Sequence, residues 1–243
     1  MEELHDILGY KNRKIFQDSE FFSFSLDSIM LANFATVRMR DKNLLDLGCG
    51  NAVIPLILSL RTDKKIIGVE IQKKLYHLAK KSISYNNLEG QITLFHSDMK
   101  DFCNVEHYEK YDLITCNPPY FRVNDKNYFN LTDEKTIARH EVKITLNEIF
   151  CVVRKLLKNN GNFAIVHRPE RLTEILLEFR KNHIEPKRIC FVYENIHKGS
   201  ILVLIEGQKN GKVGLKIEPP FILYNEDGTM TLEYAKLQME VRK

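Results

Sequence analysis

Residues 44–58, LLDLGCGNAVIPLIL, place two apolar runs on either side of a turn that contains two glycines. The first run, Asn43 to Gly48, has the length of a buried strand, and the second predicts a helix from about Ala52 to Leu60. An unbroken apolar strand that leads through a glycine turn into a helix is typical of a parallel sheet covered on both faces. The stretch therefore predicts an α/β fold, with the glycine turn at the carboxyl end of the first strand.

The rest of the chain repeats this alternation of strand and helix. Further strands are predicted at 65–70 (KIIGVE), 92–96 (ITLFH), 111–116 (YDLITC), within 159–169 (NNGNFAIVHRP), at 188–194 (RICFVYE) and at 200–207 (SILVLIEG). Further helices are predicted over 72–87, 145–157 and 170–182. The last two strands follow one another without a helix, so one antiparallel strand is expected near an edge. The prediction is a seven-stranded, mostly parallel sheet with helices on both faces.

Two segments stand outside the alternation. Residues 1–42 form a short N-terminal extension, in which FFSFSLDSIMLANFA (21–35) leads into a helix with Asp27 as its expected N-cap. Residues 209–243 contain turn signals such as KNGK and NEDGT and show little periodicity. The expected organisation is an extension at 1–42, one α/β domain at 43–208 and a partly ordered tail at 209–243.

The composition is that of an ordinary globular protein and argues against several other classes. Apolar residues make up 44% of the 243 residues and charged residues 28%, and the net charge is +4. The five cysteines form no CxxC pair and no histidine cluster accompanies them, which argues against a disulfide framework or a metal site. No stretch approaches the ~20 apolar residues that span a membrane, and no signal peptide is visible. We expect a cytoplasmic protein without a metal, as a monomer or a weak dimer.

The glycine turn has the features of a nucleotide-type binding site. Gly48 and Gly50 allow the backbone to approach a ligand closely, at the sheet edge where ligands of such folds bind. Glu70 ends the second strand, twenty residues after Gly50, where a carboxylate can accept hydrogen bonds from ribose hydroxyls. The third glycine of a dinucleotide fingerprint is missing. The remaining Asp-x-Gly-x-Gly pattern favours S-adenosylmethionine, whose ammonium group Asp46 can receive directly or through water. Glycines that serve packing alone are the alternative.

The end of the third strand offers a further cofactor contact. Asp98 follows this strand and can accept a hydrogen bond from the exocyclic amine of an adenine, while Met99 or Ile71 can supply an apolar surface for the ring. The alternative is that Asp98 caps the segment that follows it.

The tetrapeptide NPPY, Asn117 to Tyr120, follows the fourth strand at the same edge of the sheet. Its prolines hold the segment extended and have no N–H group, so its carbonyls are not readily used by local structure. The side-chain oxygen of Asn117 and the carbonyl of Pro118 can then accept both N–H groups of a planar NH₂ group, and Tyr120 can stack on a flat substrate. Holding the amine in a more tetrahedral form aims its lone pair at a methyl donor. The alternative is a stiff Pro-Pro turn that only bounds the strand.

Six segments of the chain carry a resemblance to a known family: FSLDSIMLANFA, LLDLGCGNAVIPLIL, GVEIQ, DLITCNPPYF, ARHE and NNGNFAIVHRPERL. Over about residues 22–207 the chain resembles the bacterial tRNA1(Val) (adenine-N6)-methyltransferase family. This resemblance implies a Rossmann-like class I methyltransferase that methylates N6 of the adenine immediately 3′ of a tRNA anticodon. The implied cofactor contacts are Asp27, Asp46, Gly48, Gly50, Glu70 and Asp98, and the implied catalytic residues are Asn117, Pro118 and Tyr120. Ala52 departs from the family, because relatives commonly have a further glycine there.

A tRNA partner adds the expectation of basic residues around the cleft. The candidates are Arg122, Lys126, Arg139, Lys143, Arg168 and Arg171. An ordinary solvated face, in which basic residues mix with acidic ones, is the alternative for them. Two other planar amines fit the same acceptors, the glutamine amide of a release factor and a DNA adenine. A non-catalytic RNA-binding protein that kept the fold is the alternative from a different class.

Overall fold

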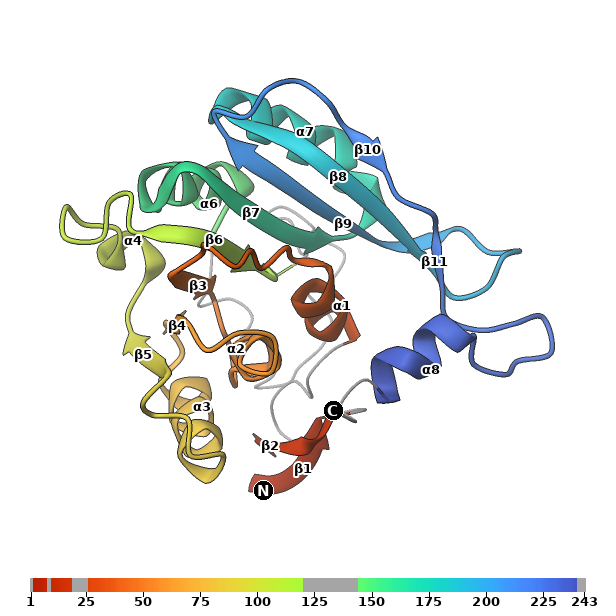
Figure 1. The fold of residues 1–243 in the computed structure, drawn as a ribbon, viewed down its shortest axis with the longest axis horizontal. Helices are drawn as coiled ribbons and strands as arrows, with labels where there is room; N and C mark the ends of the chain where they lie inside the picture. The colour runs from red at the N-terminus through yellow and green to blue at the C-terminus, as the bar shows by residue number, and fades with distance from the viewer. Residues whose placement is uncertain (1, 8–9, 19–25, 120–143, 240–243) are drawn as a thin grey trace, which may run out of the picture.

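The computed structural model describes residues 2–7, 10–18, 26–119 and 144–239, and its main body is one sheet flanked by helices (Figure 1). The central strands are β3 (Asn43–Leu47), β4 (Lys65–Glu70), β5 (Ile92–His96), β6 (Tyr111–Cys116), β7 (Leu157–His167), β8 (Ile184–Tyr193) and β9 (Ser200–Lys209). Their spatial order is β5-β4-β3-β6-β7-β9-β8. β9 runs antiparallel to both of its neighbours, and the other pairs among these strands are parallel. This confirms the predicted seven-stranded, mostly parallel sheet with one antiparallel strand.

Two short strands extend the sheet beyond this core. β10 (Lys216–Ile217) and β11 (Phe221–Ile222) both pair with β8 in parallel, so the described sheet contains nine strands. The sequence predicts neither of them, because two residues are too few to show an alternating pattern.

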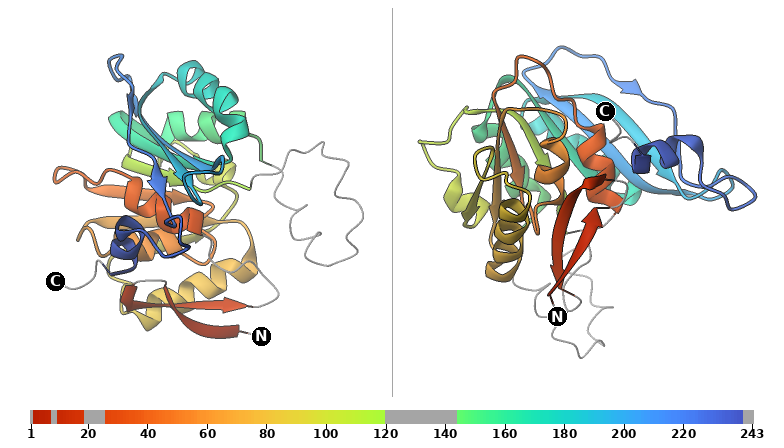
Figure 2. Two further views of the ribbon diagram at one scale, coloured as in Figure 1. Left: turned by 90° about the vertical axis from the view of Figure 1, so that its right-hand side faces the viewer. Right: turned by 60° about the horizontal axis from the view of Figure 1, so that its bottom comes forward.

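Helices cover both faces of the sheet (Figure 2). The described α-helices are α1 (Leu26–Phe34), α2 (Val53–Leu58), α3 (Lys73–Tyr85), α4 (Met99–Phe102), α6 (Leu146–Leu156), α7 (Leu172–Lys181) and α8 (Leu232–Met239). Leu44 of β3 packs in a core with α1, α2 and α3, whereas Leu45 and Leu47 pack in a second core with α6 and α7. Strand periodicity therefore places Asp46 on the face of Leu44. None of the described helices is long and apolar enough to cross a lipid bilayer.

The predicted helices are found close to their expected ends. α2, α3, α6 and α7 each begin and end within two residues of the predicted bounds, and a short 3₁₀ turn, Pro169–Arg171, precedes α7. A capping box marks the start of α6: the Thr145 side chain accepts from Glu148 N, and the Glu148 carboxylate accepts from Thr145 N at 2.8 Å.

The N-terminal extension consists of a hairpin followed by α1. β1 (Glu2–Ile7) and β2 (Tyr10–Asp18) pair antiparallel, and the hairpin lies beside α3 (Figure 2). Phe16 N of β2 donates to Ser82 Oγ of α3 at 2.9 Å. The prediction of Asp27 as an N-cap is wrong, because α1 begins at Leu26 and Asp27 lies inside its first turn. A carboxylate in the first turn is stabilised by the helix dipole.

The segment after β9 holds more regular structure than its turn signals indicate. After β10 and β11 have joined the sheet edge, α8 packs on the core that also contains α1, with Tyr234 and Leu237 buried. The rings of Tyr224 and Tyr234 meet edge to face at 5.8 Å between centroids. Contacts with the rest of the fold, rather than local periodicity, therefore order this segment.

Candidate active site

Candidate residues from separate sequence motifs lie at the carboxyl edge of the sheet. β3 lies between β4 and β6, with Asp46 opposite Gly68 on one side and Thr115 on the other. Glu70 ends β4, and Asn117 directly follows β6. Because parallel strands end at the same edge, the fold brings these motifs together at the place where α/β sheets bind ligands.

The turn after β3 contains residues in the left-handed region. Gly48 and Gly50 have φ of +69° and +55°, and Ala52 has φ of 71°. The N–H groups of Gly48 and Cys49 donate to Val69 O at 2.9 and 3.0 Å, which fixes the turn against β4. A Cβ added to Gly50 would meet no atom of the described residues within 4 Å. A ligand can therefore approach the backbone closely at Gly50.

Asp46 is a buried carboxyl group with one satisfied oxygen. The residue is 1% exposed, and Thr115 Oγ1 donates to its Oδ1 at 2.7 Å. Within the described residues, its Oδ2 has no hydrogen-bond partner. Burial raises the pKa of Asp46 to about 8; the hydrogen bond from Thr115 opposes this shift and the charge of Glu70 adds to it. A buried oxygen without a partner is costly, so the site fits a ligand that brings a cation or an N–H donor.

Glu70 links the loop after β4 to the glycine turn. The residue is 4% exposed, and its carboxylate accepts from Gly50 N at 2.8 Å and from Gln72 N at 2.7 Å. Burial raises the pKa of Glu70, while these backbone N–H groups act in the opposite direction. The carboxylate is thus held beside the open space at Gly50, the place where the sequence predicts ribose hydroxyls.

The other predicted cofactor contacts lie around this pair. Asp98 is the N-cap of α4 and accepts from Lys100 N at 2.8 Å, so the capping role that the sequence left open is present. Met99 follows it, and its Cε lies 4.0 Å from a Cβ added at Gly48. Ile71 is 37% exposed in the loop after β4. Both apolar side chains are therefore near the edge where a planar ring would bind.

Asn117 contacts a residue that the sequence analysis missed. Its Nδ2 donates to Ser28 Oγ at 2.9 Å, across 89 residues of chain. Ser28 lies beside Asp27 in the first turn of α1, so this helix reaches the carboxyl edge of the sheet where Asn117 lies. Because Nδ2 of Asn117 faces Ser28, Oδ1 of the same amide points in another direction. This is the orientation that Oδ1 needs to act as an acceptor for a ligand. The only sequence signal for Ser28 is its place beside Asp27. Pro118 is buried, and Tyr120 lies outside the described residues.

Two of the six predicted RNA contacts are described. Arg168 Nη1 donates to Ile201 O at 3.0 Å, and Arg171 Nε donates to Glu174 at 2.9 Å, so both side chains make contacts within the fold. The other four lie outside the described residues; they are Arg122, Lys126, Arg139 and Lys143.

The residues present fit S-adenosylmethionine. Oδ2 of Asp46 suits an ammonium group, and the carboxylate of Glu70 stands beside the open space at Gly50. No cluster suited to a metal ion occurs in the part of the chain that the structure describes. A sheet of this strand order, with this site at its carboxyl edge, defines a Rossmann-like methyltransferase.

Comparison with known proteins identifies the family. The chain matches the methyltransferase small domain over residues 21–185 and belongs to that family. Its cofactor is therefore S-adenosylmethionine.

Two relatives share the name tRNA1(Val) (adenine(37)-N6)-methyltransferase. That of Dyadobacter fermentans is 25% identical over 234 residues, which are 90% of this chain and 89% of the relative. That of Shewanella woodyi is 26% identical over 164 residues, which are 66% of this chain and 65% of the relative. Among solved structures, a predicted O-methyltransferase from Agrobacterium tumefaciens has a TM-score of 0.69 at 15% identity and covers 88% of this chain and 95% of its own. This last likeness concerns the fold alone.

Proposed function

We propose that the protein transfers the methyl group of S-adenosylmethionine to N6 of an adenine in tRNA, at the adenine immediately 3′ of the anticodon in a valine tRNA. The observation behind this proposal is the Asn117 amide at the end of β6, directed by Ser28 and followed by the buried Pro118. The names of the two relatives support the choice of tRNA and of adenine.

The proposed chemistry uses two acceptors on one nitrogen. Oδ1 of Asn117 and the carbonyl of Pro118 accept the two N–H groups of the adenine amine, which draws the nitrogen out of conjugation and directs its lone pair. Fixed dipoles then stabilise the positive charge that develops on nitrogen, and the proton leaves after the methyl group has arrived, so no general base is needed beforehand. Tyr120, which is assigned by its motif, stacks on the base.

The cofactor is held by residues from four segments. S-adenosylmethionine supplies an electrophilic methyl group when it is bound. Asp46 receives its ammonium group, Glu70 its ribose hydroxyls and Asp98 the exocyclic amine of its adenine. Ile71 and Met99 flank the adenine ring, and Asp27 lines the pocket from α1. The target base must leave its stack to reach Asn117, which costs least in a single-stranded loop.

Nucleoside mass spectrometry of tRNA tests the substrate. Unmodified tRNA incubated with the protein and S-adenosylmethionine is expected to gain N6-methyladenosine at the position 3′ of the valine anticodon. Parallel reactions with a release factor and with DNA separate the two other planar amines. Methylation of either of these, with none in tRNA, would reject the proposed substrate. No transfer to any of the three, with intact cofactor binding, would favour the non-catalytic alternative.

Two substitutions test the proposed mechanism. Asn117→Ala is expected to lower kcat by roughly two orders of magnitude, because a preorganised acceptor is lost, and to leave the calorimetric affinity for S-adenosylmethionine within about twofold. Ser28→Ala removes one hydrogen bond to the amide and is expected to lower kcat by up to about tenfold, with partial rescue by Ser28→Thr. Full activity of Asn117→Ala would contradict the mechanism.

A further inference from the structure

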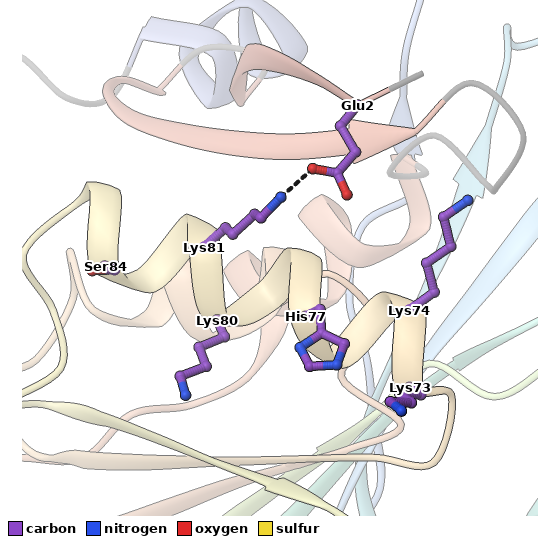
Figure 3. A pocket seen from close by; sticks show the side chains of 7 residues that line it. All are labelled: Glu2, Lys73, Lys74, His77, Lys80, Lys81 and Ser84. Atoms are coloured by element: carbon purple, nitrogen blue, oxygen red, sulfur yellow. Dashed lines mark hydrogen bonds and ion pairs between the residues drawn. The ribbon is translucent and has the colours of Figure 1, made fainter.

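A row of cationic side chains covers the exposed side of α3. Five of them, with Glu2 and Ser84, line an open groove of about 670 Å³ (Figure 3). We call the four lysines and the histidine the α3 basic surface; they are Lys73, Lys74, His77, Lys80 and Lys81. None of them belongs to the site described above.

The basic surface has two flanks with different electrostatics. On the flank that faces the hairpin, Lys74 pairs with Asp18 at 2.9 Å and Lys81 pairs with Glu2. On the other flank, Lys73 and Lys80 are exposed and form no ion pair with any described residue. Figure 3 shows these two side chains and His77 pointing away from the hairpin. Four lysines against two acids leave a local charge of +2 with the histidine neutral.

Helix stability does not explain this arrangement. Lys73 and Lys74 lie in the first turn of α3, which has no acidic residue, so two cations sit at the positive end of the helix dipole. α3 contains no acidic residue at any position, so no carboxylate within the helix offsets the charges of Lys73 and Lys80. Burial of Leu78 and Ile83 holds the helix in place instead. The lysines therefore point to a function in binding.

We propose that the α3 basic surface binds the phosphate backbone of the RNA substrate, outside the target nucleotide. The identity of the polyanion as tRNA rests on the proposed function. α3 begins three residues after Glu70, so its first turn adjoins the cofactor edge, and its 13 residues extend about 20 Å from there. The flank with unpaired lysines spans about 10 Å from Lys73 to Lys80, enough for more than one phosphate.

A membrane surface fits these observations less well. A helix that lies in a lipid interface needs an apolar face free to enter the bilayer. The apolar face of α3 is instead packed on the sheet, where Leu78, Ala79 and Ile83 are buried. Phosphate contacts from exposed lysines need no such face and provide affinity that depends on salt but not on sequence.

Binding of tRNA at different salt concentrations tests the surface. The variant is Lys73→Gln/Lys80→Gln, and the probe is a fluorescently labelled, unmodified valine tRNA followed by anisotropy between about 50 and 200 mM salt. The slope of log K against log salt is expected to become shallower by about 1 to 2, with affinity several-fold weaker at the lower salt concentrations. The calorimetric affinity for S-adenosylmethionine and the melting temperature are expected to stay at or above the wild-type values.

The matched control removes the same charge at the opposite edge of the sheet. Lys42 and Lys110 are exposed, precede β3 and β6, and form no ion pair among the described residues. Lys42→Gln/Lys110→Gln is expected to bind tRNA with the wild-type slope.

The outcomes separate this surface from the proposed function. The proposed surface is overturned if the α3 variant keeps the wild-type slope of log K against log salt. It is also overturned if the control variant loses as much of this slope as the α3 variant does. The proposed surface is also overturned if the α3 variant loses binding to phosphatidylserine vesicles while it binds tRNA as the wild type does. A wild-type protein that binds no tRNA rejects both the surface and the proposed function. If tRNA binding depends on Lys73 and Lys80 but no methyl group is transferred, the proposed function alone is rejected.

Discussion

At the scale of single residues, Asp46 and Glu70 are two buried carboxyl groups at the carboxyl edge of the sheet. Thr115 satisfies one oxygen of Asp46, and the backbone N–H groups of Gly50 and Gln72 satisfy Glu70. Burial raises the pKa of both carboxyl groups, in the case of Asp46 to about 8. The two groups therefore hold protons more readily than exposed carboxylates do. A cationic ligand shifts the equilibrium toward the ionised form.

Cofactor binding is expected to depend on pH through these groups. In the cofactor-free protein, the Asp46 carboxyl group is largely protonated at neutral pH, because its pKa is about 8. A bound ammonium group favours the carboxylate and lowers this pKa, so binding releases a proton. The affinity for S-adenosylmethionine should therefore rise between about pH 6 and 7.5, by at most about tenfold per pH unit.

Calorimetry in buffers of different ionisation enthalpy measures the released proton directly. Asp46→Asn should bind the cofactor more weakly and release fewer protons than the wild type. Wild-type binding with no proton release and no dependence on pH would contradict this account.

At the scale of elements, the turn between β3 and α2 combines left-handed backbone with an open surface. Gly48 and Gly50 adopt this conformation freely, whereas Ala52 adopts it at a cost of about 1–2 kcal/mol. Ala52 carries this cost at the position where the family resemblance leads us to expect a glycine. Gly68 of β4 serves another purpose, since a Cβ there would lie 2.7 Å from Leu94 Cδ2 and 2.8 Å from Cys49 Sγ.

Substitutions at two glycines should therefore have different effects. Gly50→Ala is expected to cost only about 1 kcal/mol of stability, from its left-handed φ, but to weaken S-adenosylmethionine binding at least tenfold, because the Cβ enters the open space. Gly68→Ala is expected to lower stability by about 1–3 kcal/mol through overpacking. Urea titration and calorimetry on both variants check this. Wild-type cofactor affinity in Gly50→Ala would place the ligand elsewhere.

At the scale of the whole molecule, a buried carboxylate in β9 binds the segment that directly follows α1 and so holds this helix against the sheet. Glu206 is 3% exposed and accepts from Thr36 N at 2.7 Å and from Thr36 Oγ1 at 2.8 Å. Arg188 Nε of β8 lies 3.4 Å from Glu206, and its guanidinium lies over the Phe34 ring at 4.4 Å from the centroid. The network holds one end of α1, while Ser28 at the other end contacts Asn117.

Removal of this charge should destabilise the fold. Glu206→Gln leaves Arg188 without its nearest carboxylate and Thr36 without a charged acceptor, so the free energy of unfolding is expected to fall by on the order of 2 kcal/mol. Urea titration measures the change. Glu226→Gln is the control, because Glu226 is 74% exposed and its pair with His197 should contribute little. Equal midpoints for the two variants would contradict the role of the network.

The sequence by itself determined the order of the seven central strands along the chain, four of the helices between them (α2, α3, α6 and α7) and the ends of three strands at which Asp46, Glu70 and Asn117 lie. These features follow from periodicity and turn chemistry, which are contained in short stretches of the chain. Asp98 shows the limit of such reasoning, because the sequence allowed both a capping and a cofactor role and the structure shows the cap.

Only the tertiary structure decided which distant residues support the site. Ser28 meets Asn117 across 89 residues, Thr36 meets Glu206 across 170, and the hairpin reaches Ser82 of α3 across 66. Single hydrogen bonds between segments so far apart leave no periodic pattern in the chain. They form because the sheet, once assembled, brings α1 and the hairpin against it, and buried polar groups there require partners.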